Sequence, residues 1–155
     1  MTNISATIVQ MTPQETAAQL GLTFEPLPRG YLNLCIRTGN LLITSGHVSD
    51  LKGKLGAGLT TPEGYEAARN CAAKILNSVW NAHGTLDGLR LLKVLGCVNS
   101  EPAFIEQHLV INGASDLFLK VFGDTDGYHA RSALGFASLP VGAAVEVEAI
   151  FEIKS

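Results

Sequence analysis

Apolar residues recur every three or four positions along the stretch that follows Thr61, which is the period of an amphipathic helix. Thr61, Pro62 and Glu63 are typical of a helix start, and Gly84 is typical of a helix end. The apolar positions of this stretch are mostly small: Ala68, Cys71, Ala72, Ile75, Leu76, Val79 and Trp80. The pattern therefore predicts a long helix that can lie close to a sheet.

Two other segments carry helix signals. Residues 12–15, Thr-Pro-Gln-Glu, form a capping box with proline at the first helical position, and Gly21 ends the short helix that they begin. A break at residues 100–102 precedes another long helix, predicted over residues 109–122 with Gly123 as its end.

The remaining apolar segments have the lengths of strands. Residues 31–37 and 41–44 flank a Thr-Gly-Asn turn and predict a hairpin. Residues 89–98 have the apolar density of a central strand. The last segment, residues 129–153, predicts two further strands around a Leu-Pro turn.

The order of these elements, ββαβ followed by αββ, predicts one α+β domain over residues 30–155. Its two long helices pack on one face of a mixed sheet, and the other face stays open. Residues 1–29 form an N-terminal extension with the short helix. The glycine-rich residues 52–58 are predicted to be a plain loop, because their spacing fits neither a phosphate-binding loop nor a dinucleotide fingerprint.

The period of two in a strand places Arg131, Ala133 and Gly135 on one face, so the small neighbours leave room for a small anion beside the guanidinium. A plain hairpin of the last two strands would bring Glu152 opposite Arg131, and an ion pair between them is the alternative. The same register separates Arg131 from Glu146 by about 20 Å. We therefore expect the two residues to share a site only if they come from different chains.

Composition narrows the function classes. The chain has 155 residues, 46% of them hydrophobic, and a net charge of -3 with Lys and Arg scattered singly, which argues against a nucleic-acid partner. No apolar run approaches the roughly 20 residues of a membrane span, and no secretory signal is readable, so a cytoplasmic location is expected. The apolar strands of the open sheet face predict a homo-oligomer.

Cysteine and histidine give few signals of chemistry. Cys35, Cys71 and Cys97 lie in apolar segments and are expected to be reduced, structural side chains. The four histidines lack the spacing of metal ligands: His47, His83, His108 and His129. His47 and His129 could face a cleft, but each is interpreted first as a surface residue.

Four segments have a recognisable combination of motifs: HARSALGFASLPVGAAVEVEA, NLLITSGHVS, EAARNCAAKIL and HLVINGASDLFLKVF. In this order they resemble the C-terminal signature, the early strand and the helices of the YjgF/RidA family, which includes relatives labelled endoribonuclease L-PSP. The N-terminal extension and the longer connection GKLGAGLTTPEGY resemble the longer branch of the family. The resemblance implies a chorismate-mutase-like fold, a homotrimer, and binding clefts between subunits.

The resemblance also implies an activity. Family members hydrolyse reactive 2-imino or 2-enamino acids to 2-keto acids and ammonia, without a metal or cofactor. By position, Arg131 would hold the carboxylate of a small metabolite and Glu146 would orient the attacking water. Further residues would line the cleft: Tyr31, Ser45, Gly46, Asn112 and Ala133.

The chain departs from the family pattern at two places. Relatives show Pro-Ala-Arg-Ser-Cys where this chain has His-Ala-Arg-Ser-Ala, so Ala133 replaces a cysteine of the cleft. His47 follows Thr-Ser-Gly where relatives carry glutamine or another residue.

Two other functions stay open. The same Arg131 could bind a keto acid in a sensing protein without catalysis, or the chain could share the ribonuclease or translation-inhibitor role attached to some relatives. Chorismate rearrangement is suggested by the fold analogy alone.

Overall fold

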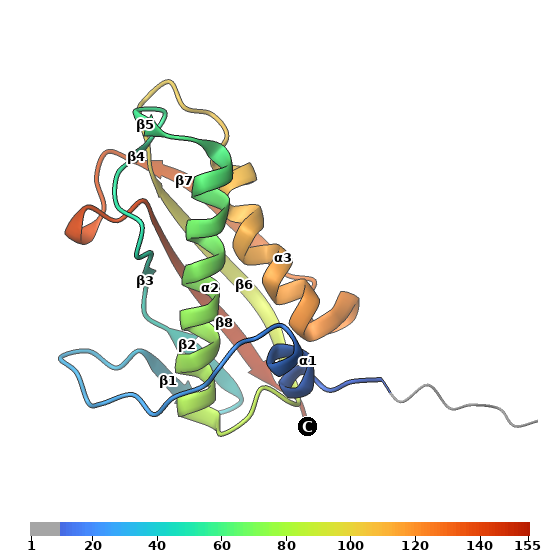
Figure 1. The fold of residues 1–155 in the computed structure, drawn as a ribbon. Coiled ribbons are helices and arrows are strands. Elements are labelled where there is room, and N and C mark those ends of the chain that lie inside the picture. Colours follow the sequence, from blue (N-terminus) through green and yellow to red (C-terminus); the bar gives the residue numbers. More distant parts are fainter. Residues whose placement is uncertain (1–9) are drawn as a thin grey trace, which may run out of the picture.

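A computed structural model describes residues 10–155 and contains the predicted helices (Figure 1). Helix α1 spans Pro13–Gln19, α2 spans Thr61–His83 and α3 spans Gln107–Asp126. The predicted capping box of α1 is confirmed, since the Glu15 amide donates to Thr12 Oγ1 over 3.2 Å and the Thr12 amide to the Glu15 carboxylate over 2.9 Å. Gly84 ends α2, as predicted.

Helix α3 is longer than the sequence predicts. Gly123 has a φ of 74°, which side-chain-bearing residues rarely adopt, and it interrupts the helical backbone. One further turn follows and reaches Asp126. Gly123 therefore marks a kink near the end of α3, and the prediction of an end at this residue was wrong by one turn.

The sheet is mixed, which confirms the predicted fold class. Its main strands are β1 (Cys35–Thr38), β2 (Leu41–Thr44), β6 (Leu89–Asn99), β7 (Ala130–Phe136) and β8 (Val145–Ile153). Their order is β1-β2-β8-β6-β7, and the short β3 (His47–Val48) also pairs with β8. Strands β6 and β7 run parallel, whereas the other pairs of this sheet are antiparallel.

The predicted hairpin of the last two strands is wrong, because β6 lies between β7 and β8. Helix α3 connects β6 to β7 as a crossover, and such a connection returns the chain parallel to the strand it left. Arg131 consequently pairs with Val94, while Glu152 pairs with Arg90 at the other end of β6. A turn of 3-10 helix, Pro140–Gly142, carries the chain on to β8.

Two other segments differ from their predictions. The glycine-rich loop contains two short paired strands, β4 (Lys54–Leu55) and β5 (Gly58–Leu59). The first strand of the predicted hairpin begins at Cys35, so Tyr31 lies in the loop before it.

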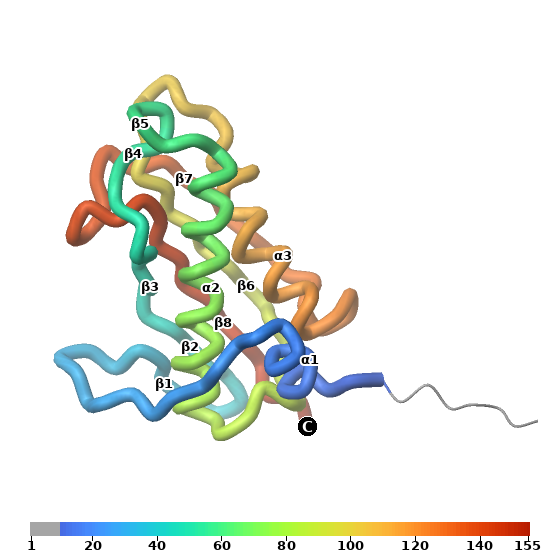
Figure 2. Tube along the Cα trace, viewed as in Figure 1, coloured from blue at the N-terminus to red at the C-terminus, as the bar shows by residue number. Residues whose placement is uncertain are grey.

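Helices α2 and α3 cover one face of the sheet, and the core lies between them and the strands (Figures 1 and 2). The small α2 residues Ala68, Cys71 and Ala72 are completely buried, as the sequence pattern predicts for a helix packed closely on a sheet. The opposite face has no helix over it. Ile36, Leu134 and Phe136 are 47%, 49% and 41% exposed, so apolar surface is left open.

The N-terminal segment crosses the C-terminal half of α2 (Figure 2). Asn77 Oδ1 accepts from the Glu25 amide over 2.9 Å, and Asn81 Oδ1 accepts from the Leu27 amide over 2.9 Å. The Phe24 ring stacks on Trp80 with ring centroids 5.9 Å apart. We call residues 22–27 the N-terminal strap. The predicted boundary at residue 29 stays a prediction, and residues 1–9 of the predicted extension lie outside the described residues.

Candidate functional site

Arg131 lies on the edge strand β7 and reaches toward α3. Its Nη1 donates to Asn112 Oδ1 over 2.9 Å and to Ser115 Oγ over 3.1 Å, and its Nη2 donates to the His108 carbonyl over 3.3 Å. The two residues of the site prediction that belong together here are therefore Arg131 and Asn112. Ser115 was missed, because only the crossover brings it beside β7.

The charge of Arg131 is not neutralised by an ion pair. No carboxylate of residues 10–155 lies within 4.0 Å of its guanidinium, and its hydrogen-bond acceptors are an amide, a hydroxyl and a carbonyl. The alternative that Arg131 pairs with Glu152 is wrong, since Glu152 lies 3.9 Å from Arg90. Arg131 is thus a half-buried cation with neutral partners.

The surroundings of Arg131 differ from the expected open space beside small residues. Ala133 packs partly against the core, the Arg131 side chain reaches α3, and a Cβ at Gly135 would point to Gln107 of α3. Ala133 therefore lies at the floor between β7 and α3. The guanidinium therefore lies on the helix-covered side, at the edge of the sheet, and not above the uncovered face.

Glu146 lies on the other face of the sheet. Arg131 pairs with Val94 and Glu146 with Cys97, and residues an odd number apart in a strand point to opposite faces. A Cβ at Gly46 would lie 1.9 Å from Glu146 Oε1, so the carboxylate lies directly against the Gly46 backbone. Burial, and then the neighbouring Glu148, raise the pKa of Glu146 above its usual value.

Ser45 and His47 build the turn beside Glu146. The Ser45 hydroxyl donates to the Asn33 carbonyl over 2.8 Å, which ties the turn to the loop before β1. The Ser45 carbonyl lies 2.8 Å from His47 Nδ1, and Ser78 Oγ of α2 lies 2.7 Å from His47 Nε2. Since a carbonyl only accepts, Nδ1 carries the proton and Ser78 donates to Nε2.

His47 is buried, with 6% of its surface exposed, so the interpretation as a surface residue was wrong. Burial is the main cause that lowers the pKa of His47. The imidazole is thus held neutral and fixes the Ser45–Gly46 turn. Ser78 was missed because it lies 31 positions away, on α2.

His129 is half-buried and joins the Arg131 network. Its Nδ1 donates to the Gly127 carbonyl over 2.6 Å, and its Nε2 lies 3.0 Å from Ser115 Oγ. Burial is the main cause that lowers the pKa of His129. Ser115 can therefore accept from Arg131 while it donates to His129.

Tyr31 lies in the loop before β1, where its side chain is fully exposed. This loop and the C-terminal half of α2 line a cavity of about 1060 Å³. Tyr31 belongs to this cavity and not to the surroundings of Arg131. Apart from Tyr31, the predicted site residues hence form two groups within one chain: Arg131, Asn112 and Ala133 in one, and Ser45, Gly46 and Glu146 in the other.

The cysteines are free, as predicted. Burial raises the pKa of Cys35 to about 11, of Cys71 to about 12 and of Cys97 to about 11. Cys97 pairs with Glu146 across the sheet, but its thiol stays protonated at neutral pH and is a poor nucleophile. Within residues 10–155, no three His, Cys, Asp or Glu side chains converge on a point that could hold a metal ion.

None of the described helices is long and apolar enough to cross a membrane.

Comparison with known proteins gives a fold that agrees with the structure. A family model described as "YjgF/chorismate mutase-like, putative endoribonuclease" matches residues 9–152. Protein TCP17 of Trypanosoma cruzi is 51% identical over 106 residues, which are 68% of this chain. The match spans 66% of that protein, just under two thirds of its length.

Solved structures are similar as well. The Agrobacterium tumefaciens protein Atu1372, of unknown function, is 39% identical, with a TM-score of 0.83 over 93% of this chain and 94% of its own. The YjgF gene product of Escherichia coli is 22% identical, with a TM-score of 0.59 over 84% of this chain and 93% of its own. The second likeness concerns the fold alone.

Proposed function

Because the chain belongs to the YjgF/chorismate mutase-like family, we propose that it hydrolyses reactive 2-imino and 2-enamino acids to 2-keto acids and ammonia in the cytoplasm. The substrates are small carboxylates, and the reaction uses water with no cofactor. The observation that carries this proposal is the guanidinium of Arg131, which has no carboxylate partner among residues 10–155.

An unpaired, half-buried guanidinium at the edge of a sheet is suited to a carboxylate ligand. Its two parallel donors match the two oxygens of a carboxylate, and such a charge-assisted contact contributes about 1.5 to 3 kcal/mol. Asn112 and Ser115 hold the guanidinium in place from α3, which reduces the entropy lost on binding.

Glu146 supports the hydrolytic step. The raised pKa of Glu146 is closer to neutral pH than the usual pKa of a glutamate, and a general base works best when its pKa is near the working pH. In the proposed reaction Glu146 accepts a proton from water as the oxygen adds to the imine carbon. The proton passes to the nitrogen, which gives an adduct with a hydroxyl and an amino group on one carbon. As the carbon–nitrogen bond breaks, the hydroxyl proton is transferred to the amino group, so ammonia is released and the keto acid remains.

Arg131 and Glu146 belong to opposite faces of one sheet, so we propose that a complete site takes them from two chains of a homotrimer. The exposed apolar residues Ile36, Leu134 and Phe136 support this assembly, because a second copy would cover them. The fully exposed Tyr31 would reach the same cleft from a neighbouring copy.

The first experiment generates 2-iminopropanoate with an amino-acid oxidase and traps it with semicarbazide. The wild-type protein should reduce the amount of adduct. Arg131→Lys should lower this activity about 10- to 100-fold, because an ammonium cannot make the bidentate contact. Arg37→Lys is the matched control, since Arg37 is an exposed arginine on β1, and it should act like the wild type.

Two outcomes would contradict the proposal. Equal activity of Arg131→Lys and the wild type would remove Arg131 from the reaction. If no imine of any size is hydrolysed while a keto acid still binds, the sensing alternative replaces the enzyme. RNA cleavage that survives Arg131→Ala would point to a different site or to contamination.

A further inference from the structure

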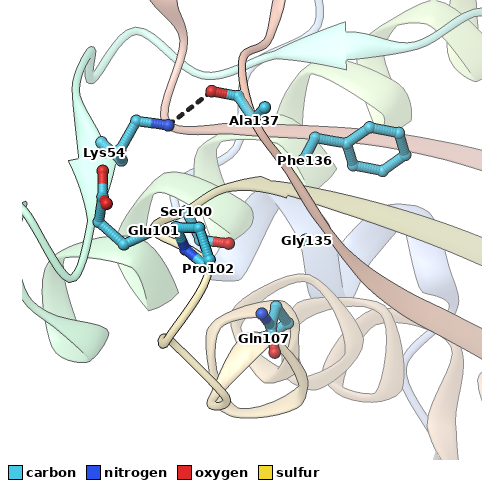
Figure 3. Close-up of a pocket in the computed structure, with 8 residues that line it drawn as sticks. All are labelled: Lys54, Ser100, Glu101, Pro102, Gln107, Gly135, Phe136 and Ala137. Atoms are coloured by element: carbon cyan, nitrogen blue, oxygen red, sulfur yellow. Dashed lines mark hydrogen bonds between the residues drawn. The ribbon is translucent and has the colours of Figure 1, made fainter.

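A second pocket lies where β7, the turn after β6 and the start of α3 meet (Figure 3). Its volume is about 330 Å³, and it is lined by Lys54, Ser100, Glu101, Pro102, Gln107, Gly135, Phe136 and Ala137. Gly135 follows Arg131 by four positions, which is about 13 Å along the strand. Gly135 shares its strand face with Arg131 and Ala133, and the other lining residues lie outside the candidate site described above.

Ser100 presents a hydroxyl to this pocket. The residue is only 6% exposed, and it lines the pocket. A Cβ at Gly135 would lie 2.8 Å from Ser100 Oγ, so the hydroxyl lies directly over the bare backbone of β7. A serine hydroxyl carries one donor hydrogen, which can be given to an anion in the pocket.

Lys54 supplies a positive charge beside the hydroxyl. Its Nζ donates to Asn99 Oδ1 over 2.9 Å and to the Ala137 carbonyl over 2.6 Å (Figure 3). An ammonium has three donors, so one remains for a ligand. The lysine comes from β4, in the glycine-rich segment that was predicted to be a plain loop.

Gln107 and the start of α3 add further donors. Gln107 Nε2 uses one of its two hydrogens on the Phe104 carbonyl, over 2.6 Å. Glu106, at the N-cap of α3, makes no side-chain cap, and its carboxylate accepts from the Thr61 hydroxyl instead. The positive end of the α3 dipole therefore adds to the charge of Lys54.

Gly135 keeps the pocket open. A side chain there would place its Cβ 2.8 Å from both Ser100 Oγ and Gln107 Nε2, in the space between the donors. Glu101 also lines the pocket and is its one acidic side chain. A doubly charged anion would be repelled by this carboxylate more strongly than a singly charged one.

We propose that this pocket binds the carboxylate group of a small metabolite. The lysine ammonium, the Ser100 hydroxyl and the second Gln107 hydrogen are the donors. The group belongs either to a separate monocarboxylate or to the far end of a dicarboxylate held by Arg131, and both have the same chemistry. The proposal does not rest on deaminase activity.

The test is a titration of the isotope-labelled protein with sodium acetate, followed by NMR and compared with sodium chloride at equal ionic strength. The amide signals of Gly135, Ser100 and Gln107 should shift and saturate with acetate alone. Lys54→Gln and Gly135→Ala should each weaken this binding at least about tenfold. Lys120→Gln, which removes an exposed lysine of α3, is the matched control and should bind acetate like the wild type.

Glu101→Gln makes the test independent of folding defects, because it should strengthen acetate binding. Shifts that do not saturate, or that are the same in Lys54→Gln and Lys120→Gln, would overturn the proposal.

A titration with glutarate distinguishes the two sources of the carboxylate. Binding at least about tenfold tighter than acetate, and lost in both Arg131→Lys and Lys54→Gln, indicates one ligand that spans both sites. Loss in Lys54→Gln alone indicates a separate ligand.

Discussion

At the scale of single residues, the position of the Glu146 carboxylate depends on the absence of a side chain at Gly46. Glu146 Oε1 occupies the space that a Cβ of residue 46 would fill. The Glu146 side chain is partly exposed, so a larger residue 46 would displace its carboxylate without disturbing the core. Position 46 therefore controls the orientation of Glu146 more than it controls stability.

Gly46→Ala should lower imine hydrolysis at least about tenfold while the melting temperature falls by only a few degrees, because Glu146 must swing away from the turn. Semicarbazide trapping and calorimetry measure the two effects. Gly30→Ala is the control, because a Cβ there would meet only the Leu32 carbonyl at 3.7 Å. If Gly46→Ala kept full activity, Glu146 would not act as the base in this orientation.

At the scale of elements, α2 holds together parts of the chain that are distant in sequence. Ser78 contacts His47 and thereby fixes the turn after β2, while Asn77 and Asn81 hold the N-terminal strap. The neutral imidazole of His47 accepts from Ser78, and burial of the ring disfavours its charged form. Stability should consequently depend on pH through the protonation of this buried ring.

The pKa of His47 is lowered in the folded state, so the unfolded chain, with a His pKa of about 6.5, binds the proton more readily. The stabilisation is complete above pH 6.5 and is lost as the pH falls toward the folded pKa. His47→Gln should therefore show a shallower loss of unfolding free energy between pH 7.5 and 5 than the wild type. Urea unfolding measures it, and His108→Gln, at an exposed histidine, should keep the wild-type slope.

The periodicity of the sequence was sufficient to identify the helices and strands. It was not sufficient to predict which strands pair with one another. The small apolar stripe after Thr61 identified α2, and residues 89–98 identified β6, because both patterns are local. The place of β7 beside β6 depends on the crossover through α3. The short connection between β7 and β8 was wrongly assumed to form a hairpin. The burial of His47 and the pocket position of Lys54 likewise depend on partners more than 30 residues away.

At the scale of the whole molecule, the two groups of site residues lie on different sides of one chain. Arg131 and Asn112 lie between β7 and α3, whereas Gly46 and Glu146 lie on the uncovered side. The proposed homotrimer would join the first group of one copy to the second group of the next. Complementation between inactive copies tests this arrangement directly.

Equal mixtures of Arg131→Ala and Glu146→Ala chains should recover about one quarter of wild-type activity after subunit exchange, because each site then draws its two residues from chains chosen at random. Mixed Arg131→Ala and Asn112→Ala chains are the control and should stay inactive, since both residues come from one copy. Sedimentation verifies the trimer and mass spectrometry the exchange. Recovery in neither mixture would place the two groups in separate sites.

The stacking of Phe24 on Trp80 also gives this protein a built-in optical reporter. Trp80 is the one tryptophan of the chain, so all indole fluorescence comes from the place where the N-terminal strap lies on α2. Detachment of the strap exposes the indole to water and shifts its emission to the red, while circular dichroism still reports intact helices. The two signals can therefore distinguish a local opening beside the Tyr31 loop from unfolding of the whole domain.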